Sequence, residues 1–179
     1  MARPRHVLHR PRLPPEPLTT VSPTGPIDVE HLSDLEPELS ERVSSTVWCT
    51  LATTDRAGRP RTRVVHPVWD GAVGWLGSRP DTLKLAHLTA TPWVSLMYWD
   101  PRHQQVAIEA RATICDDAAS LAAAWAAFSA PPEPYGYDPS PIWPDGPDVG
   151  FVAVRLDPVR VSMFGAPPRT WTSPELTRP

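Results

Sequence analysis

The sequence predicts a mainly β domain in which six antiparallel strands, with helices inserted between them, form a small barrel. From Thr46 onward most apolar residues alternate with polar ones, which is the period of a strand with one buried face. Two turn signals, Asp55-Arg56-Ala57-Gly58 and Asp70-Gly71, join the first three alternating runs as hairpins. Closing such a sheet into a barrel removes its exposed edges. A length of 179 residues with 41% hydrophobic residues suits a single domain.

Residues 1–26 form the first segment, which we interpret as a flexible arm rich in proline and arginine. It holds seven of the 25 prolines and has no helical or strand period. Two interpretations stay open: a solvated tail, which the composition favours, and an arm that folds over an anionic ligand or a partner subunit. The arginines of this segment are Arg3, Arg5, Arg10 and Arg12.

The folded domain is expected over residues 27–165. It begins with a helix that starts at Asp28 or Ser33, because apolar residues recur at helical spacing between Leu32 and Val43. The later elements are strands over residues 47–53, 61–69, 72–77, 93–99, 105–115 and 149–163, a short helix capped by Ser78 or Asp81 that ends before Pro92, and an alanine-rich helix capped by Asp116 or Asp117 that ends at Phe128.

A proline-rich loop over residues 131–148 separates the last helix from the last strand. Long loops in compact domains are commonly functional, and this one carries Tyr135, Tyr137 and Trp143. We expect these aromatic residues to cover a flat ligand; the alternative is a loop packed down by its own aromatics.

Residues 166–179 are expected to form a C-terminal tail. Four tryptophans at periodic positions are expected in the core: Trp48, Trp93, Trp99 and Trp125.

Charge and composition exclude several classes of protein. A net charge of -3 and a pI near 6.0 argue against a nucleic-acid binder, which needs a basic surface. No apolar run approaches the roughly 20 residues that cross a bilayer, and the N-terminus lacks the apolar centre of a secretory signal, so we expect a cytoplasmic protein without a membrane partner. Cys49 and Cys115 lie in apolar stretches and are expected as buried thiols. No metal site is expected, because His87 and His103 have no partner at metal-ligand spacing.

One constellation could carry chemistry. Two neighbouring strands and a helix N-terminus bring basic and hydroxyl side chains to one end of the sheet, and such groups suit a phosphate. They include the only lysine of the chain. The alternative interpretation is a solvated basic face of a hairpin. The residues concerned are Arg61, Arg63, Ser78, Arg79, Thr82 and Lys84.

At this point the sequence resembles the pyridoxamine 5'-phosphate oxidase-like, FMN-binding split β-barrel family, over roughly residues 40–163. The resemblance lies in an ordered succession of motifs. They are Cys49-Thr50-Leu51-Ala52-Thr53-Thr54, Gly58-Arg59-Pro60, Arg63-Val64-Val65, Gly74-Trp75-Leu76-Gly77-Ser78-Arg79, Thr82-Leu83-Lys84, Leu88, Pro92-Trp93-Val94-Ser95-Leu96 and Ala110-Arg111-Ala112.

The resemblance implies a homodimeric split β-barrel with FMN at the dimer interface, acting as an oxidoreductase on a small conjugated substrate. By motif match, the flavin is lined by Arg63, Val64, Val65 and His66, and its phosphate is held by Ser78, Arg79, Thr82 and Lys84, with Arg61 nearby. Catalytic residues are not identified, because a flavin brings its own hydride chemistry.

This chain departs from the family in one respect. The C-terminal arginine-rich segment that grips the substrate in true pyridoxamine 5'-phosphate oxidases has no counterpart here, so vitamin B6 oxidation is not expected. Two alternatives remain: a reductase that uses the deazaflavin coenzyme, and a flavin-binding or sensing protein without turnover. We favour FMN, because its single phosphate matches the predicted cluster, whereas the acidic tail of the deazaflavin coenzyme would need the arginines of residues 1–26 as well.

Overall fold

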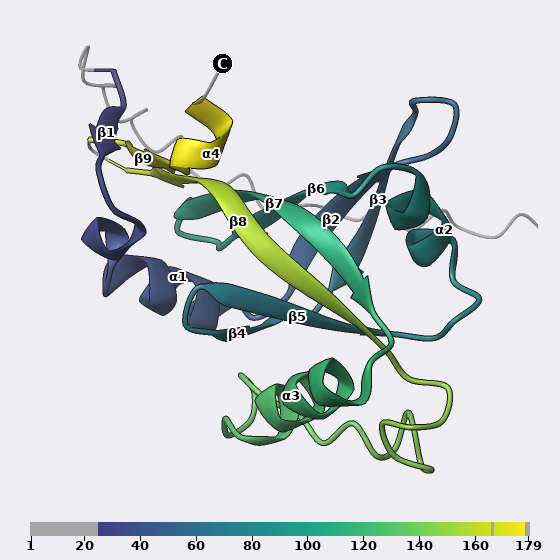
Figure 1. Ribbon diagram of the computed structural model, residues 1–179. Coiled ribbons are helices and arrows are strands. Elements are labelled where there is room, and N and C mark those ends of the chain that lie inside the picture. The colour runs from purple at the N-terminus through teal and green to yellow at the C-terminus, as the bar shows by residue number, and fades with distance from the viewer. Residues whose placement is uncertain (1–24, 166, 178–179) are drawn as a thin grey trace, which may run out of the picture.

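The structure, a computed structural model, describes residues 25–165 and 167–177 and is mainly β (Figure 1). Its nine strands form one mixed sheet. The strands are β1 (Ile27–Val29), β2 (Cys49–Thr54), β3 (Pro60–Val65), β4 (Val68–Asp70), β5 (Val73–Ser78), β6 (Trp93–Trp99), β7 (Gln105–Cys115), β8 (Val152–Phe164) and β9 (Arg169–Thr172). The helices are the 3-10 turn η1 (Leu32–Leu35) and the α-helices α1 (Glu38–Thr46), α2 (Leu83–Ala90), α3 (Ala118–Ser129) and α4 (Pro174–Thr177).

The sheet is organised around β8, which crosses the molecule diagonally (Figure 1). The order of strands is β1-β9-β8-β7-β6-β2-β3, and β5 pairs with β8 and carries β4 on its other side. Residues 152–156 of β8 pair with β5, and residues 160–163 pair with β9. Pro158 lies between these two stretches and has no backbone N–H to donate. The pairing of β8 with β5 ends before this proline, and its pairing with β9 begins after it.

The six predicted strands are present and pair in antiparallel fashion, but the sheet has nine strands and is mixed, because β1 pairs in parallel with β9. The expected strand 61–69 is divided into β3 and β4 by His66 and Pro67, because a proline cannot continue the ladder. Within the described ranges no ladder joins β3 to β5, so pairing does not close a six-stranded ring.

The two ends of the described chain pair with each other as strands, which the sequence analysis did not predict. Ile27–Val29, expected within or before a helix, pairs in parallel with Arg169–Trp171, which was expected in a tail. The helix α1 begins only at Glu38, after Pro37. Strand pairing between segments more than 140 residues apart leaves no local signal, and the short segments alone carry too little alternation to reveal it.

The two later helices follow their predicted spans closely. The side chain of Asp117 accepts a hydrogen bond from the backbone N–H of Ser120 and caps α3, as expected. For α2 the predicted caps are wrong, because the helix begins after Thr82, and neither Ser78 nor Asp81 is its cap. Ser78 instead ends β5, and its hydroxyl lies 2.8 Å from that of Thr82.

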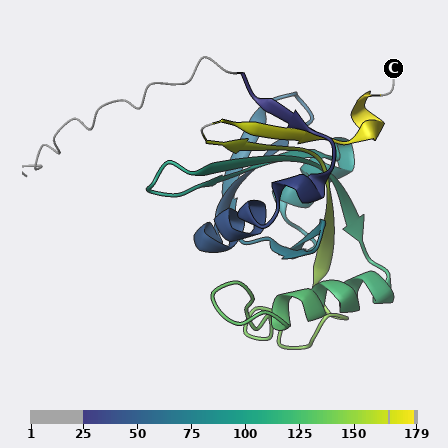
Figure 2. The same ribbon diagram turned by 90° about the vertical axis from the view of Figure 1, so that its left-hand side faces the viewer.

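Two apolar clusters form the core. The larger cluster fills the space between the curled sheet, α1 and α2, and includes Leu51, Leu96 and Ile108. The smaller cluster lies between α3, β5 and the following loop, and includes Phe128 and Trp143. Figure 2 shows α3 and its loop as a layer below the sheet.

The tryptophans illustrate a prediction that the structure corrects. Trp48, Trp93 and Trp99, expected in the core, are 59%, 47% and 53% exposed, whereas Trp125 packs against the smaller cluster. In β6 the residues that alternate with Trp93 and Trp99 point inward instead, and they end in the buried Tyr98. The alternating pattern was correct, but β6 turns its tryptophan face outward, which leaves an apolar surface. No helix in the described part of the chain is long and apolar enough to span a membrane.

Candidate cofactor site

Four polar side chains from β3, β5 and α2 meet at one end of the sheet, and we call them the cradle: Arg63, Ser78, Thr82 and Lys84. The hydroxyl oxygens of Ser78 and Thr82 are 2.8 Å apart. The Nζ of Lys84 donates to the carbonyl oxygen of Gly77, the residue before Ser78, over 3.3 Å. Arg63 is close enough to Lys84 for its charge to lower the pKa of that lysine. Of the residues that the sequence analysis named, the structure thus brings these four together.

The cradle carries positive charge without a matching carboxylate. Among the described residues neither Arg63 nor Lys84 forms an ion pair. Burial, with a smaller effect from Arg63, lowers the pKa of Lys84 from 10.5 to about 8, and burial also lowers the pKa of Arg63. Partly buried cations are costly unless an opposite charge compensates them. Two such cations beside two hydroxyls suit a phosphate group.

A buried threonine and a histidine, both missed in the sequence, hold Arg63 in place. Arg63 Nη1 donates to Thr53 Oγ1 over 2.9 Å, and the same oxygen lies 2.9 Å from Nδ1 of His87 in α2. Leu51 is the cross-strand partner of Arg63, so the guanidinium reaches diagonally to Thr53 two residues along β2. Thr53 is only 2% exposed. A polar residue at an inward position of β2 was the signal that could have indicated it.

His66 connects the end of β3 to the proline-rich loop. Its Nε2 donates to the carbonyl oxygen of Tyr135 over 3.0 Å, and its ring centre lies 5.1 Å from those of both Trp48 and Tyr137. Burial lowers the pKa of His66, more than its hydrogen bond to Tyr135 raises it. The neutral imidazole therefore links the loop to the end of β3, and the rings of Trp48 and Tyr137 pack beside it.

Other predicted residues lie elsewhere. Arg61 is paired with Asp55 in the β2–β3 turn, with 3.3 Å between Nη2 and Oδ2. Val64 is 68% exposed on the face of β3 opposite to Arg63 and Val65. Arg79 is exposed beyond the end of β5.

Trp143 is not free to cover a ligand. It is buried, its Nε1 donates to the carbonyl oxygen of Gly150 over 3.0 Å, and its ring packs edge-on against Phe151. Its neighbour Gly77 has room for no more than a hydrogen, because a Cβ there would lie 2.8 Å from the indole. The alternative interpretation of the loop applies to this residue: Trp143 packs the loop down. Tyr135 remains 45% exposed.

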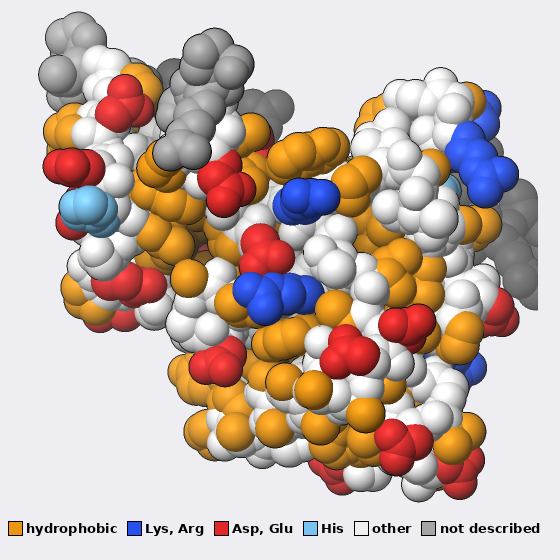
Figure 3. All heavy atoms as spheres, viewed as in Figure 1, with side chains coloured by type: hydrophobic (Ala, Val, Ile, Leu, Met, Phe, Trp, Pro, Cys, Tyr) orange, Lys and Arg blue, Asp and Glu red, His pale blue; other side chains and the backbone are white. Residues whose placement is uncertain are grey.

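Basic residues avoid the layer built by α3. The sequence has no arginine or lysine between Arg111 and Arg155, and Figure 3 shows apolar and acidic side chains around α3. An anion is therefore expected at the cradle and not on this layer. No group of three or more metal-ligating side chains occurs among the residues that the structure describes.

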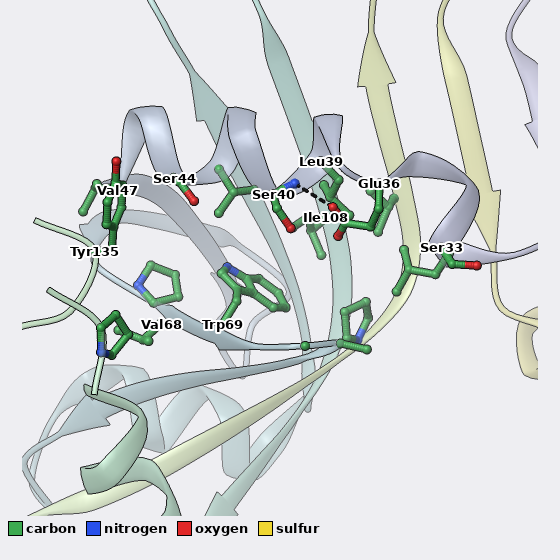
Figure 4. A pocket seen from close by; sticks show the side chains of 18 residues that line it. Ser33, Glu36, Leu39, Ser40, Ser44, Val47, Val68, Trp69, Ile108 and Tyr135 are labelled. Carbon is green, nitrogen blue, oxygen red and sulfur yellow. Dashed lines mark hydrogen bonds between the residues drawn. The ribbon is translucent and has the colours of Figure 1, made fainter. Parts of the chain in front are cut away.

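A cavity of about 610 Å³ lies beside the loop, between α1 on one side and β4 on the other (Figure 4). It was not predicted, because its walls come from segments far apart in the sequence. Pro67 and Val68, which directly follow His66, line it together with Tyr135. The cavity thus begins where the β3 segment ends.

Comparisons with known proteins identify the family and the fold of the chain. The family model described as pyridoxamine 5'-phosphate oxidase matches residues 35–162. No curated protein matches the chain.

Many solved structures share the fold, among them the three that follow. An FMN-binding protein from Nostoc punctiforme is 19% identical, with 79% of this chain and 91% of that chain covered and a TM-score of 0.56. An F420 reductase is 19% identical, with 69% and 94% covered and a TM-score of 0.51. A heme storage protein from Vibrio cholerae is 24% identical, with 69% and 89% covered and a TM-score of 0.55. The names of these proteins mention FMN, F420 and heme, so the shared fold alone does not identify a ligand for this chain.

Proposed function

Because this chain belongs to the pyridoxamine 5'-phosphate oxidase family, we propose that it is an oxidoreductase that binds FMN, with the phosphate in the cradle. The observation that carries the proposal is a pair of cations, Arg63 and Lys84, that have no ion-pair partner in the described part of the chain and lie beside the hydroxyls of Ser78 and Thr82. A phosphate dianion would compensate both charges and accept hydrogen bonds from all four residues. Thr53 and His87 keep Arg63 oriented toward it. Arg61, bound to Asp55, takes a lesser part.

The ring system of the cofactor is assigned to the segment after Arg63. Val65 and His66 offer an apolar edge and a neutral imidazole, and Trp48 and Tyr137 flank that imidazole. Bound FMN supplies the hydride chemistry. The residues of this chain bind it, orient it and keep water from one side of it.

We also propose that the chain is a homodimer that shares this site across a two-fold axis. The outward face of the sheet carries exposed apolar residues, because Val64 of β3 and Met97 of β6 lie on either side of Thr50 of β2, in register with it. Met97 is 38% exposed and Val64 68%. Exposed apolar residues gathered on one face of a protein mark an interaction surface. Trp93, Trp99 and Trp48 extend it along and beside the same strands.

The deazaflavin coenzyme is the second candidate cofactor. It continues past its phosphate into an acidic tail, and the arginines proposed for that tail, Arg3, Arg5, Arg10 and Arg12, lie outside the described residues. The cradle accounts for one phosphate, so FMN remains the proposal.

Titration of the apoprotein with FMN and with coenzyme F420 tests the proposal. We expect tight FMN binding and weaker F420 binding, both unchanged when the four N-terminal arginines are replaced by serine. Tight F420 binding that these substitutions abolish, together with weak FMN binding, would overturn the choice of cofactor. Repeated turnover with a reductant and a panel of acceptors supports an enzyme, whereas flavin binding without turnover supports a binding or sensing protein.

The pKa of Lys84 predicts how FMN affinity depends on pH. Lys84 is a cation below a pKa of about 8 and neutral above it, whereas the FMN phosphate stays dianionic above pH 7. Affinity for FMN is therefore expected to fall as the pH rises from 7 to 9, with proton uptake on binding in that range. The Lys84→Arg variant should show a flatter profile, because arginine stays charged. Riboflavin, which has the ring but not the phosphate, should show no such fall; an equal fall for riboflavin would contradict the assignment.

A further inference from the structure

The cavity between α1 and β4 has a chemical character opposite to that of the cradle (Figure 4). Its walls are largely apolar and include Leu39, Val68, Ile108 and Val161, of which Ile108 and Val161 are almost fully buried. Glu36 is the single charged residue in its lining. A volume of about 610 Å³ lies within the range of small-molecule sites and holds two or three fused rings.

We propose that this cavity binds the substrate, and that the substrate is an uncharged, ring-containing apolar molecule without phosphate or carboxylate; the assignment as substrate site rests on the proposed function. Among the described residues, no arginine, lysine or histidine lines this space, and Glu36 does. Burying a charge without a partner is unfavourable, and a like charge adds repulsion. The cavity therefore disfavours a phosphorylated substrate.

The cavity lies next to the residues proposed to contact the cofactor ring. His66 ends the β3 segment assigned to the ring, and the next two residues, Pro67 and Val68, are cavity wall. The carbonyl oxygen of Tyr135 is held by His66, and Tyr135 also lines the cavity. A molecule in the cavity would thus share a boundary with the site of the ring.

Rigid ring-containing side chains form part of the cavity wall. Three prolines contribute to its walls: Pro67, Pro131 and Pro158. Trp69 contributes its indole ring, but its Nε1 already donates to the hydroxyl of Tyr98 over 2.8 Å. Trp69 therefore offers ring surface and no hydrogen bond. Hydroxyl groups in the lining come from Ser40 and Ser44 of α1, and also from Ser33 and Tyr135.

A matched pair of fluorescent probes tests the proposal on the full chain. N-phenyl-1-naphthylamine is uncharged, and 1-anilinonaphthalene-8-sulfonate has the same rings and adds one sulfonate. We expect the uncharged probe to bind at least tenfold more tightly than the sulfonate. Glu36→Gln should narrow this difference, because it removes the like charge.

Variants that fill the cavity locate the binding. Ser44→Trp places an indole in the cavity from α1, and Ala72→Trp does so from the β4–β5 turn. Each substitution is expected to weaken binding of the uncharged probe at least tenfold. Ser45→Trp is the matched control, because Ser45 is exposed on α1 and does not line the cavity. Equal binding by both filled variants and the control, or tight binding of the sulfonate, would overturn the proposal.

Flavin binding is measured separately on the same variants, so that the two proposals fail in different ways. Filling the cavity should leave FMN affinity within about threefold of that of the unaltered chain, and loading with FMN should quench the bound probe by energy transfer. If FMN does not bind but the probe does, the proposed function fails and the cavity remains a binding site. If FMN binds and the probe stays unquenched, the cavity is not next to the cofactor and its role as substrate site is wrong.

Discussion

Replacing Arg63 or Lys84 by alanine is expected to weaken FMN binding by about 1.5 to 3 kcal/mol, or roughly 10- to 150-fold, the range for hydrogen bonds to charged groups. Each variant removes one of the two cations of the cradle, and neither cation has a carboxylate partner in the described structure that would compete with the phosphate. Titration followed by the quenching of flavin fluorescence measures the change.

Two controls separate a phosphate contact from a structural effect. Riboflavin should bind both variants about as well as it binds the unaltered protein, since it has no phosphate. Arg61→Ala, two residues from Arg63 on the same strand, should weaken FMN binding much less, because the guanidinium of Arg61 is already paired with Asp55. Riboflavin binding that weakened as much as FMN binding would show that Arg63 and Lys84 act on the structure and not on the phosphate.

The Met97→Asp variant is expected to convert the proposed dimer to a monomer, with dimer affinity reduced by at least about a hundredfold. Met97 lies on the outward face of β6, between Thr50 of β2 and Ala107 of β7. A two-fold axis would bury the introduced carboxylate in both subunits, without a partner for either charge. Analytical ultracentrifugation over a range of concentrations measures the change.

Val149→Asp is the matched control for this substitution. Val149 is also an exposed apolar residue, at 57%, but it lies in the loop before β8 and away from the outward face of β6. It should leave the dimer intact. The Met97→Asp monomer should also lose FMN if two subunits share each site. A monomer that binds FMN at full strength would contradict the shared site.

Local patterns in the sequence determined most of the elements of this protein. Alternation located β6 and β7 to the residue, the Asp70-Gly71 signal located the turn between β4 and β5, and Asp117 identified the start of α3. These features depend on residues close together in the chain, whose backbone preferences act before any tertiary contact exists. The convergence of Arg63 with the segment from Ser78 to Lys84 was expected from two neighbouring strands, but among the described residues no ladder joins β3 to β5, so these residues meet through the curl of the sheet and the position of α2.

Tertiary structure alone decided which face of each strand is buried, and therefore what the site contains. Alternation groups Trp93 with Trp99 but does not say which face meets the core, and the buried partners Leu96 and Tyr98 show that the tryptophan face turns outward. The pairing of β1 with β9 and the support of Arg63 by Thr53 and His87 join residues distant in sequence. The cavity is likewise a property of how α1 packs against β4. Such contacts depend on how whole helices and strands pack against one another. The free energy of that packing involves residues from several segments, so it cannot be deduced from any one segment alone.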